Sequence, residues 1–181
     1  MARTTPVRAT KASPVQARKA PANRVTEPLQ VALRILARRP RTELELDLAL
    51  RRKQVPEADR KVVVARLREL GYMDDRELAR VRAQSLLANG TAPRLAARRL
   101  SAQGVAAGDV HSAVAEAAGG ASEAALVALA LQKRLRGRAP RDEKERQRIF
   151  RALLAKGHRA SQVARALEMK WEGDDDASAD D

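Results

Sequence analysis

The residues with the clearest chemical potential are arginines and lysines that cluster along predicted helices. Arg presents a planar fork of donors that binds phosphate or carboxylate bidentately, and Lys adds a flexible point charge. The candidate contact residues are Arg34, Arg38 and Arg39, with Arg41 beside them; Arg94, Arg98 and Arg99; and Lys133, Arg134, Arg136, Arg138 and Arg141. These clusters indicate contact with a polyanion, and a solvated helix face is the alternative interpretation of each cluster.

Residues that could support catalysis are few. His111 and His158 are isolated in helical patterns, where packing or capping is the expected role. Asp74 and Asp75 resemble a metal-binding pair, but capping of a helix start by an acidic residue explains them. The sequence contains no Gly-x4-Gly-Lys loop, no His-x-x-x-His pair and no nucleophile elbow. We therefore expect no enzymatic activity, no metal and no cofactor.

Composition favours an intracellular helical protein. The chain has 181 residues, no cysteine and 2% aromatic residues. The lack of cysteine excludes disulfides and is compatible with the cytosol. No apolar run approaches the ~20 residues that span a bilayer, and the start lacks the apolar stretch of a secretory signal. We expect a cytoplasmic protein with no membrane partner; the Arg/Thr-rich start leaves an organellar transit peptide as an alternative.

The net charge of +13 is unevenly distributed. Residues 1–28 carry six basic groups and one acid, whereas residues 171–181 carry six acids and no base, which leaves +14 for the residues between them. Because both ends lack apolar periodicity, we predict a disordered basic arm over residues 1–27 and a disordered acidic tail over residues 171–181. The basic body is expected to bind DNA phosphates without sequence preference. The scarcity of aromatic stacking platforms argues against tight autonomous binding of single strands.

The body of the chain shows helical periodicity throughout and no convincing strand pattern. Thr42 with Glu45 forms a capping box, and Asp74, Ser122 and Ser161 are expected to cap later helices. Seven of the predicted helices run over about 28–38, 57–70, 74–88, 107–118, 122–136, 140–156 and 161–170. The second predicted helix begins at Thr42 and ends before Val55, and the fifth begins at Thr91 and ends at Gly104.

A short helical string recurs along the chain. LSAQGV at residues 100–105 is echoed by LLAKGH at residues 153–158 and, more weakly, by LRRKQV at residues 50–55. Helix starts near 28, 74 and 121 are spaced by a similar distance. This pattern predicts an all-α protein of three tandem three-helix repeats (28–73, 74–120 and 121–170) that form an elongated, curved array. Such arrays usually present a surface to a partner.

The sequence resembles the bacterial RecX family over residues 29–169. The most specific string is GYMDD at residues 71–75, between the first two predicted repeats. It is accompanied by ALRIL at 32–36, by QGV at 103–105 and by RALLAKGH at 151–158. Two positions depart from the family pattern, since Leu78 and His158 stand where aromatic residues are usual.

The resemblance implies a non-enzymatic, monomeric protein that binds the RecA recombinase, docks along its filament on DNA and restrains its ATPase and strand-exchange activities. The residues alone support a basic helical binding module. A general architectural protein that binds DNA without sequence specificity is the alternative function.

Overall fold

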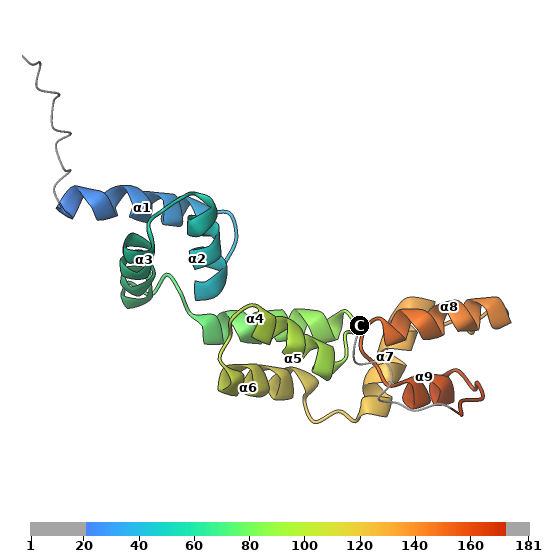
Figure 1. Ribbon diagram of the computed structural model, residues 1–181. Helices are drawn as coiled ribbons and strands as arrows, with labels where there is room; N and C mark the ends of the chain where they lie inside the picture. Colours follow the sequence, from blue (N-terminus) through green and yellow to red (C-terminus); the bar gives the residue numbers. More distant parts are fainter. Residues whose placement is uncertain (1–20, 173–181) are drawn as a thin grey trace, which may run out of the picture.

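The computed structural model describes residues 21–172, with side chains from residue 27 onward. Within this range the protein is entirely helical, which confirms the predicted all-α class. The helices are α1 (Pro21–Leu36), α2 (Glu43–Arg52), α3 (Glu57–Glu69), α4 (Asp75–Ala88), α5 (Pro93–Ala102), α6 (Ala107–Ala118), α7 (Glu123–Leu135), α8 (Glu143–Leu154) and α9 (Ala160–Ala166). Figure 1 shows them as successive groups of three.

Three helix starts are fixed by the predicted caps. The Thr42 side chain accepts a hydrogen bond from the Glu45 N–H, and Glu45 accepts one from the Thr42 N–H, so the capping box is confirmed. Asp74 and Ser122 cap α4 and α7 in the same way. These side chains satisfy N–H groups that have no partner within their own helix.

Three predicted helix starts were wrong. The first helix begins at Pro21 rather than near residue 28, so residues 21–27 are helical and not part of a disordered arm. Proline suits the first helical position because its missing N–H would be unpaired there in any case. Residues 1–20 and 173–181, which hold the rest of the predicted arm and most of the predicted tail, lie outside the described residues.

The other two differences concern the last two helices. Asp142 caps α8, which therefore starts at Glu143 instead of near residue 140. Arg159, not Ser161, precedes the first residue of α9, and its carbonyl accepts the first helical bond, from the Val163 N–H at 3.0 Å. This helix ends at Ala166 because Glu168 takes a left-handed conformation, with φ of 56°.

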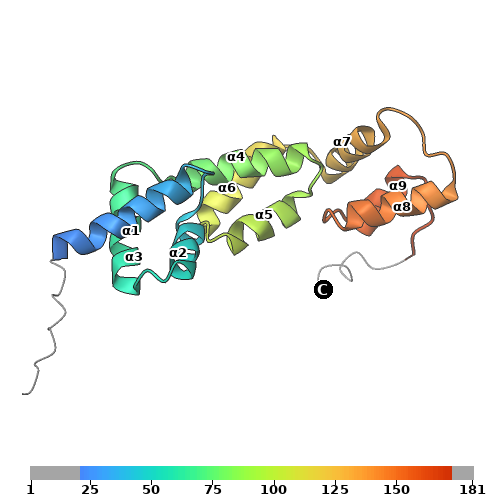
Figure 2. The same ribbon diagram turned by 90° about the horizontal axis from the view of Figure 1, so that it is seen from above.

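Each group of three helices has its own apolar core, and we call the groups the first, second and third units. Figures 1 and 2 show the units following one another in an extended row. The buried cores comprise Ala32, Leu46, Leu50, Val63, Leu67 and Met73 in the first unit; Ala79, Ala83, Leu100, Val105, Val110 and Ala113 in the second; and Val127, Ala130, Leu131, Leu135, Ile149, Phe150, Leu153, Ala160, Val163, Ala164 and Leu167 in the third.

In the described part of the chain, no single helix is long and apolar enough to cross a membrane. Helices α6 and α7 meet the length and composition test only as a pair, and they are bent by 66° at the break between them.

Replacing the α4 cap is expected to have a modest, local effect. Asp74→Ala removes the acceptor of the Glu77 N–H, now at 2.9 Å, and should lower the free energy of unfolding by about 1 kcal/mol. Urea denaturation followed by circular dichroism measures this change. Asp74→Asn retains a capping oxygen and should recover most of the loss; equal stability of the Ala variant and the wild type would contradict the assignment.

Candidate nucleic-acid interface

The recurring helix–glycine string forms the contact between consecutive units. The glycine turn between the second and third helices of one unit packs against the start of the second helix of the preceding unit. A Cβ added at Gly104 would lie 2.5 Å from the Cβ of Leu44, and one added at Gly157 would lie 2.6 Å from the Cβ of Leu95. Glycine is therefore required at both turns, whose φ is +85°. The repeat in the sequence is a repeat of this interface.

The first interface, between the first and second units, is held by polar side chains around α2. The Thr42 hydroxyl donates to the Gln103 carbonyl oxygen at 2.6 Å. Arg82 of α4 pairs with Glu45 at 2.7 Å and also bonds the Gln103 side chain. The Glu43 N–H donates to the Asp75 carboxylate at 3.1 Å. The capping box of α2, with Asp75 and Arg82 of α4, thus also joins the units.

Ionisation of the first interface follows from these contacts. Burial, the largest influence, raises the pKa of Glu45, but hydrogen bonds from Arg82 and the Thr42 backbone outweigh it and lower the pKa overall. The pKa of Asp75 is raised, chiefly by burial, although the hydrogen bond from Glu43 opposes the change. Asp75 therefore serves as an acceptor between units, whereas Asp74 caps α4.

The second interface, between the second and third units, uses basic side chains to bind backbone carbonyls. Arg94 donates to the carbonyl oxygens of Gly157 and His158, the latter at 3.3 Å. Lys133 donates to the carbonyl oxygen of Ala88 at 2.8 Å, at the end of α4. Cations suit this position because the end of a helix carries partial negative charge. Two of the predicted contact residues, Arg94 and Lys133, thus hold units together.

His158 is the buried polar residue of the second interface. It is 1% exposed, and its Nε2 lies 3.0 Å from the Gly90 carbonyl oxygen. Because a carbonyl only accepts, Nε2 must carry the proton, which leaves Nδ1 as a buried acceptor without a hydrogen-bond partner. Burial lowers the pKa of His158, and the Gly90 hydrogen bond opposes this only in part. The interface therefore favours the neutral imidazole.

Lowering the pH is expected to weaken the second interface. Since the folded-state pKa of His158 lies below that of the unfolded chain, the unfolded state binds the proton first. The stabilising contribution is complete above about pH 6.5 and is lost as the pH falls through the folded-state pKa. Urea unfolding at about pH 7.5 and about pH 5.5 should show this loss in the wild type and not in His158→Gln. His111→Gln, at an exposed site, is the control; the same pH dependence in His158→Gln and wild type would contradict the assignment.

The remaining predicted cations differ in exposure. Arg138 forms a two-pronged ion pair with Glu145, at 2.8 and 2.6 Å. Arg41 is half-buried, and its Nε lacks a hydrogen-bond partner. Lys133 and Arg138 are exposed despite their contacts, and so are Arg34, Arg38, Arg39, Arg98, Arg99, Arg134, Arg136 and Arg141. Contacts, and not exposure, therefore distinguish the cations that stabilise the protein, which are Arg94, Lys133 and Arg138.

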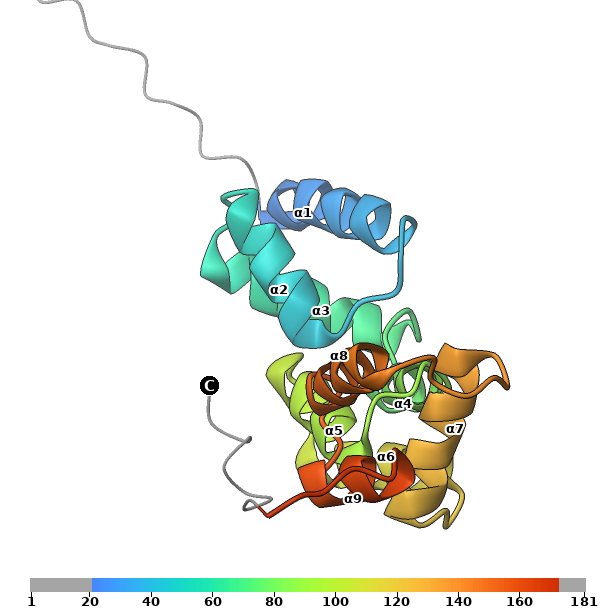
Figure 3. The ribbon, with the colours of Figure 1, turned by 90° about the vertical axis from the view of Figure 1, so that its right-hand side faces the viewer.

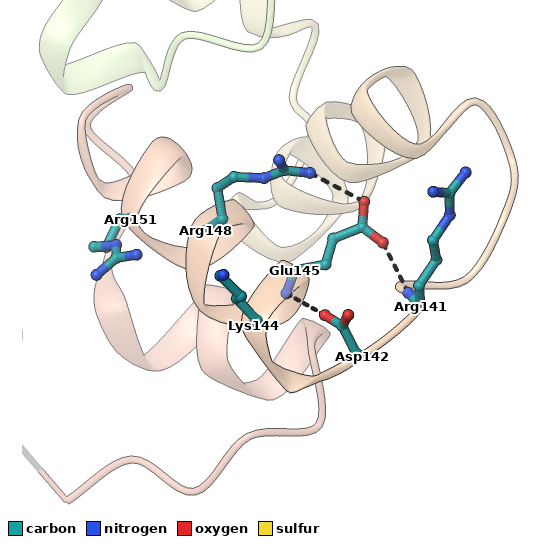
Figure 4. A pocket seen from close by; sticks show the side chains of 6 residues that line it. All are labelled: Arg141, Asp142, Lys144, Glu145, Arg148 and Arg151. Carbon is teal, nitrogen blue, oxygen red and sulfur yellow. Dashed lines mark hydrogen bonds and ion pairs between the residues drawn. The ribbon is translucent and has the colours of Figure 1, made fainter.

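A further basic surface lies along α8, and sequence reasoning named its Arg141 but missed its other cations, Lys144, Arg148 and Arg151. Arg141, Lys144, Arg148 and Arg151 line a hollow of about 240 Å³, together with Asp142 and Glu145 (Figure 4). We call this hollow the α8 basic surface. The i, i+4, i+7 spacing of Lys144, Arg148 and Arg151 places them on one helix face and was the available signal. It was hidden because acidic residues alternate with the cations in this segment.

Glu145 organises this surface. It accepts hydrogen bonds from the Arg138 side chain and, at 2.8 Å, from the Arg141 N–H, and these bonds lower its pKa to about 2. Arg148 lies 3.3 Å from the same carboxylate, as Figure 4 shows. Glu145 is consequently ionised at neutral pH, and its charge is offset by its neighbours. Lys144 and Arg151 remain exposed on the same helix.

The class of protein that the fold defines is an elongated helical-repeat protein with exposed cations on its surface. A family profile described as the first three-helix domain of RecX matches residues 29–67. Regulatory protein RecX of Thermobifida fusca is 31% identical over 146 residues, which cover 80% of this chain and 78% of that protein. Regulatory protein RecX of Streptomyces coelicolor is 28% identical over 170 residues, covering 92% and 90%. The chain belongs to the RecX family.

Solved structures share the fold. The crystal structure of RecX from Lactobacillus salivarius matches with a TM-score of 0.58 and 18% identity, over 81% of this chain and 98% of that chain. A second crystal structure, of a regulatory protein RecX, matches with a TM-score of 0.60 and 19% identity, over 81% of this chain and 72% of that chain. At this identity the likeness supports the arrangement of the helices and not the role of individual residues.

Proposed function

We propose that this protein is a regulator that binds the RecA recombinase on DNA and restrains its ATPase and strand-exchange activities. The observation that carries the proposal is the 31% identity to a regulatory protein RecX over 80% of the chain. The extended row of units supports it, because such a row can follow a filament over more of its length than a globular domain of the same size. RecA and the DNA phosphate backbone are the proposed partners.

The basic residues divide into two proposed roles. Arg94, Lys133 and Arg138 fix the shape of the protein through contacts with carbonyls or Glu145. The exposed cations are the proposed contacts to the filament. We expect the protein to act as a cytoplasmic monomer without catalytic activity or a cofactor, in keeping with the description of its relatives as regulatory proteins.

A general DNA-binding architectural role is the second candidate, and the net charge of +13 favours it. The two functions differ in their need for RecA. Immobilised protein should retain RecA from solution, both with a single-stranded oligonucleotide and after nuclease treatment, if it is a RecA regulator. Retention of DNA alone, with no RecA bound under either condition, would favour the architectural role and contradict the proposed function.

A further inference from the structure

The start of the second helix has a defined task in the first two units. In the first unit this position, at Thr42 and Leu44 of α2, receives the glycine turn at Gly104. In the second unit it receives the turn at Gly157: the Ala92 N–H donates to the Lys156 carbonyl oxygen at 2.8 Å, and Leu95 packs on the glycine. In both units, hydrogen-bond donors at the helix start bind carbonyl oxygens of the next unit.

The same position in the third unit is the start of α8, and no further unit of this chain follows it among the described residues. Figure 1 places this helix start at the far end of the row, and Figure 3, which views the row from that end, shows α8 on the near side. Leu44 is the second residue of α2, and Leu95 is the third residue of α5. The second and third residues of α8 are Lys144 and Glu145, so charged side chains replace leucine at this position. The α8 basic surface thus occupies the position at which another unit would dock.

We propose that the α8 basic surface is a contact site for the phosphate backbone of a nucleic acid strand. The proposal rests on the proposed function and names one surface that serves it. Along the helix axis, Arg148 lies about 6 Å beyond Lys144, and Arg151 lies about 4.5 Å beyond Arg148. A strand carries one phosphate per about 3.4 Å of duplex axis. The cations of one α8 face therefore span about three phosphate-to-phosphate intervals, that is, about four consecutive phosphates. Arg148 is oriented by Glu145 and still has guanidinium donors directed to solvent.

The lining of the surface favours a phosphate backbone over a protein. All six lining residues are charged, and none is apolar or aromatic. Protein interfaces usually have a core depleted of charge, whereas nucleic-acid interfaces are polar and strongly basic. A second copy of this chain is disfavoured as the occupant. The free turn of its first unit carries Lys53 and Gln54, so it would bring another cation and a side chain in place of glycine.

Salt dependence of DNA affinity tests the proposal. The double variant Lys144→Gln/Arg151→Gln removes one lysine and one arginine whose side chains form no hydrogen bond or ion pair with the described residues. The matched control, Arg52→Gln/Lys53→Gln, removes one arginine and one lysine from the exposed end of α2. Fluorescence anisotropy with a labelled oligonucleotide, single-stranded and duplex, gives the slope of log affinity against log salt. We expect the α8 variant to reduce the slope by about 1.4 to 1.8, since each lost phosphate contact accounts for about 0.7 (single strand) to 0.9 (duplex). The α2 variant should have the wild-type slope.

Unchanged slopes in the α8 variant, or an equal reduction in both variants with circular dichroism spectra intact, would overturn the proposal. The proposal would also be overturned if the α8 variant bound DNA as the wild type does but no longer retained RecA in the absence of DNA. The surface would then bind an acidic protein and not a nucleic acid. Failure of the proposed function is a separate result: wild-type protein would not bind RecA, whatever the DNA slope.

Discussion

Gly157→Ala is expected to lower the free energy of unfolding by about 2–5 kcal/mol. Left-handed backbone at a residue with a side chain costs about 1–2 kcal/mol, and an overpacked contact adds about 1–3 kcal/mol. Both apply here, because φ is +85° and the new Cβ would lie 2.6 Å from the Cβ of Leu95. The second interface must open or shift to accommodate the methyl group.

Gly137→Ala is the matched control in the same unit. Its φ is +78°, but nothing lies within 4 Å of the added Cβ, so only the backbone cost of about 1–2 kcal/mol applies. Trp171, the single tryptophan, lies with its ring centroid 5.5 Å from that of Phe150 in α8 and reports unfolding of the third unit by fluorescence. Equal losses in the two variants would show that Gly157 does not form a close contact between units.

Arg94→Ala is expected to lower the free energy of unfolding by about 2–3 kcal/mol. The substitution removes the guanidinium that donates to the Gly157 and His158 carbonyl oxygens, and hydrogen bonds from charged groups contribute about 1.5–3 kcal/mol. Any loss of DNA or RecA binding in this variant would then follow from a disturbed arrangement of the second and third units.

Arg99→Ala, on the exposed side of the same helix, separates structure from binding. It should leave stability within about 0.5 kcal/mol of wild type, because substitutions at exposed positions usually do. Urea unfolding followed by Trp171 fluorescence and circular dichroism compares the two variants. If Arg99→Ala destabilises the protein as much as Arg94→Ala, the structural role assigned to Arg94 is wrong.

Local sequence signals were sufficient for most of the helices. Periodicity with Thr42, Asp74 and Ser122 located three helix starts, because a cap acts on N–H groups only two or three residues away. The prediction of Ser161 as the cap of α9 was wrong because the backbone is already helical at Ala160. The Arg159 N–H, just before this helix, donates to the Glu123 carboxylate from α7. That contact is tertiary and leaves no local pattern.

The contact surface could be predicted only in part. Arg94 and Arg98 lie one turn apart on α5, and nothing in their spacing shows that Arg94 meets the Gly157 turn, more than 60 residues later in the chain. The glycines carried the better signal. Gly104 and Gly157 recur where a following unit docks on a preceding one, whereas the first copy has Gln54, at φ of 61°, in a turn with no unit before it among the described residues.

The DNA-dependent ATPase of RecA, titrated with this protein, tests the central claim most directly. RecA is assembled on single-stranded DNA, and the protein is added from substoichiometric amounts to saturation. A regulator that docks along the filament should inhibit ATP hydrolysis when it is present at far less than one molecule per RecA. An unchanged rate at saturating protein, with the protein folded by circular dichroism, would contradict it.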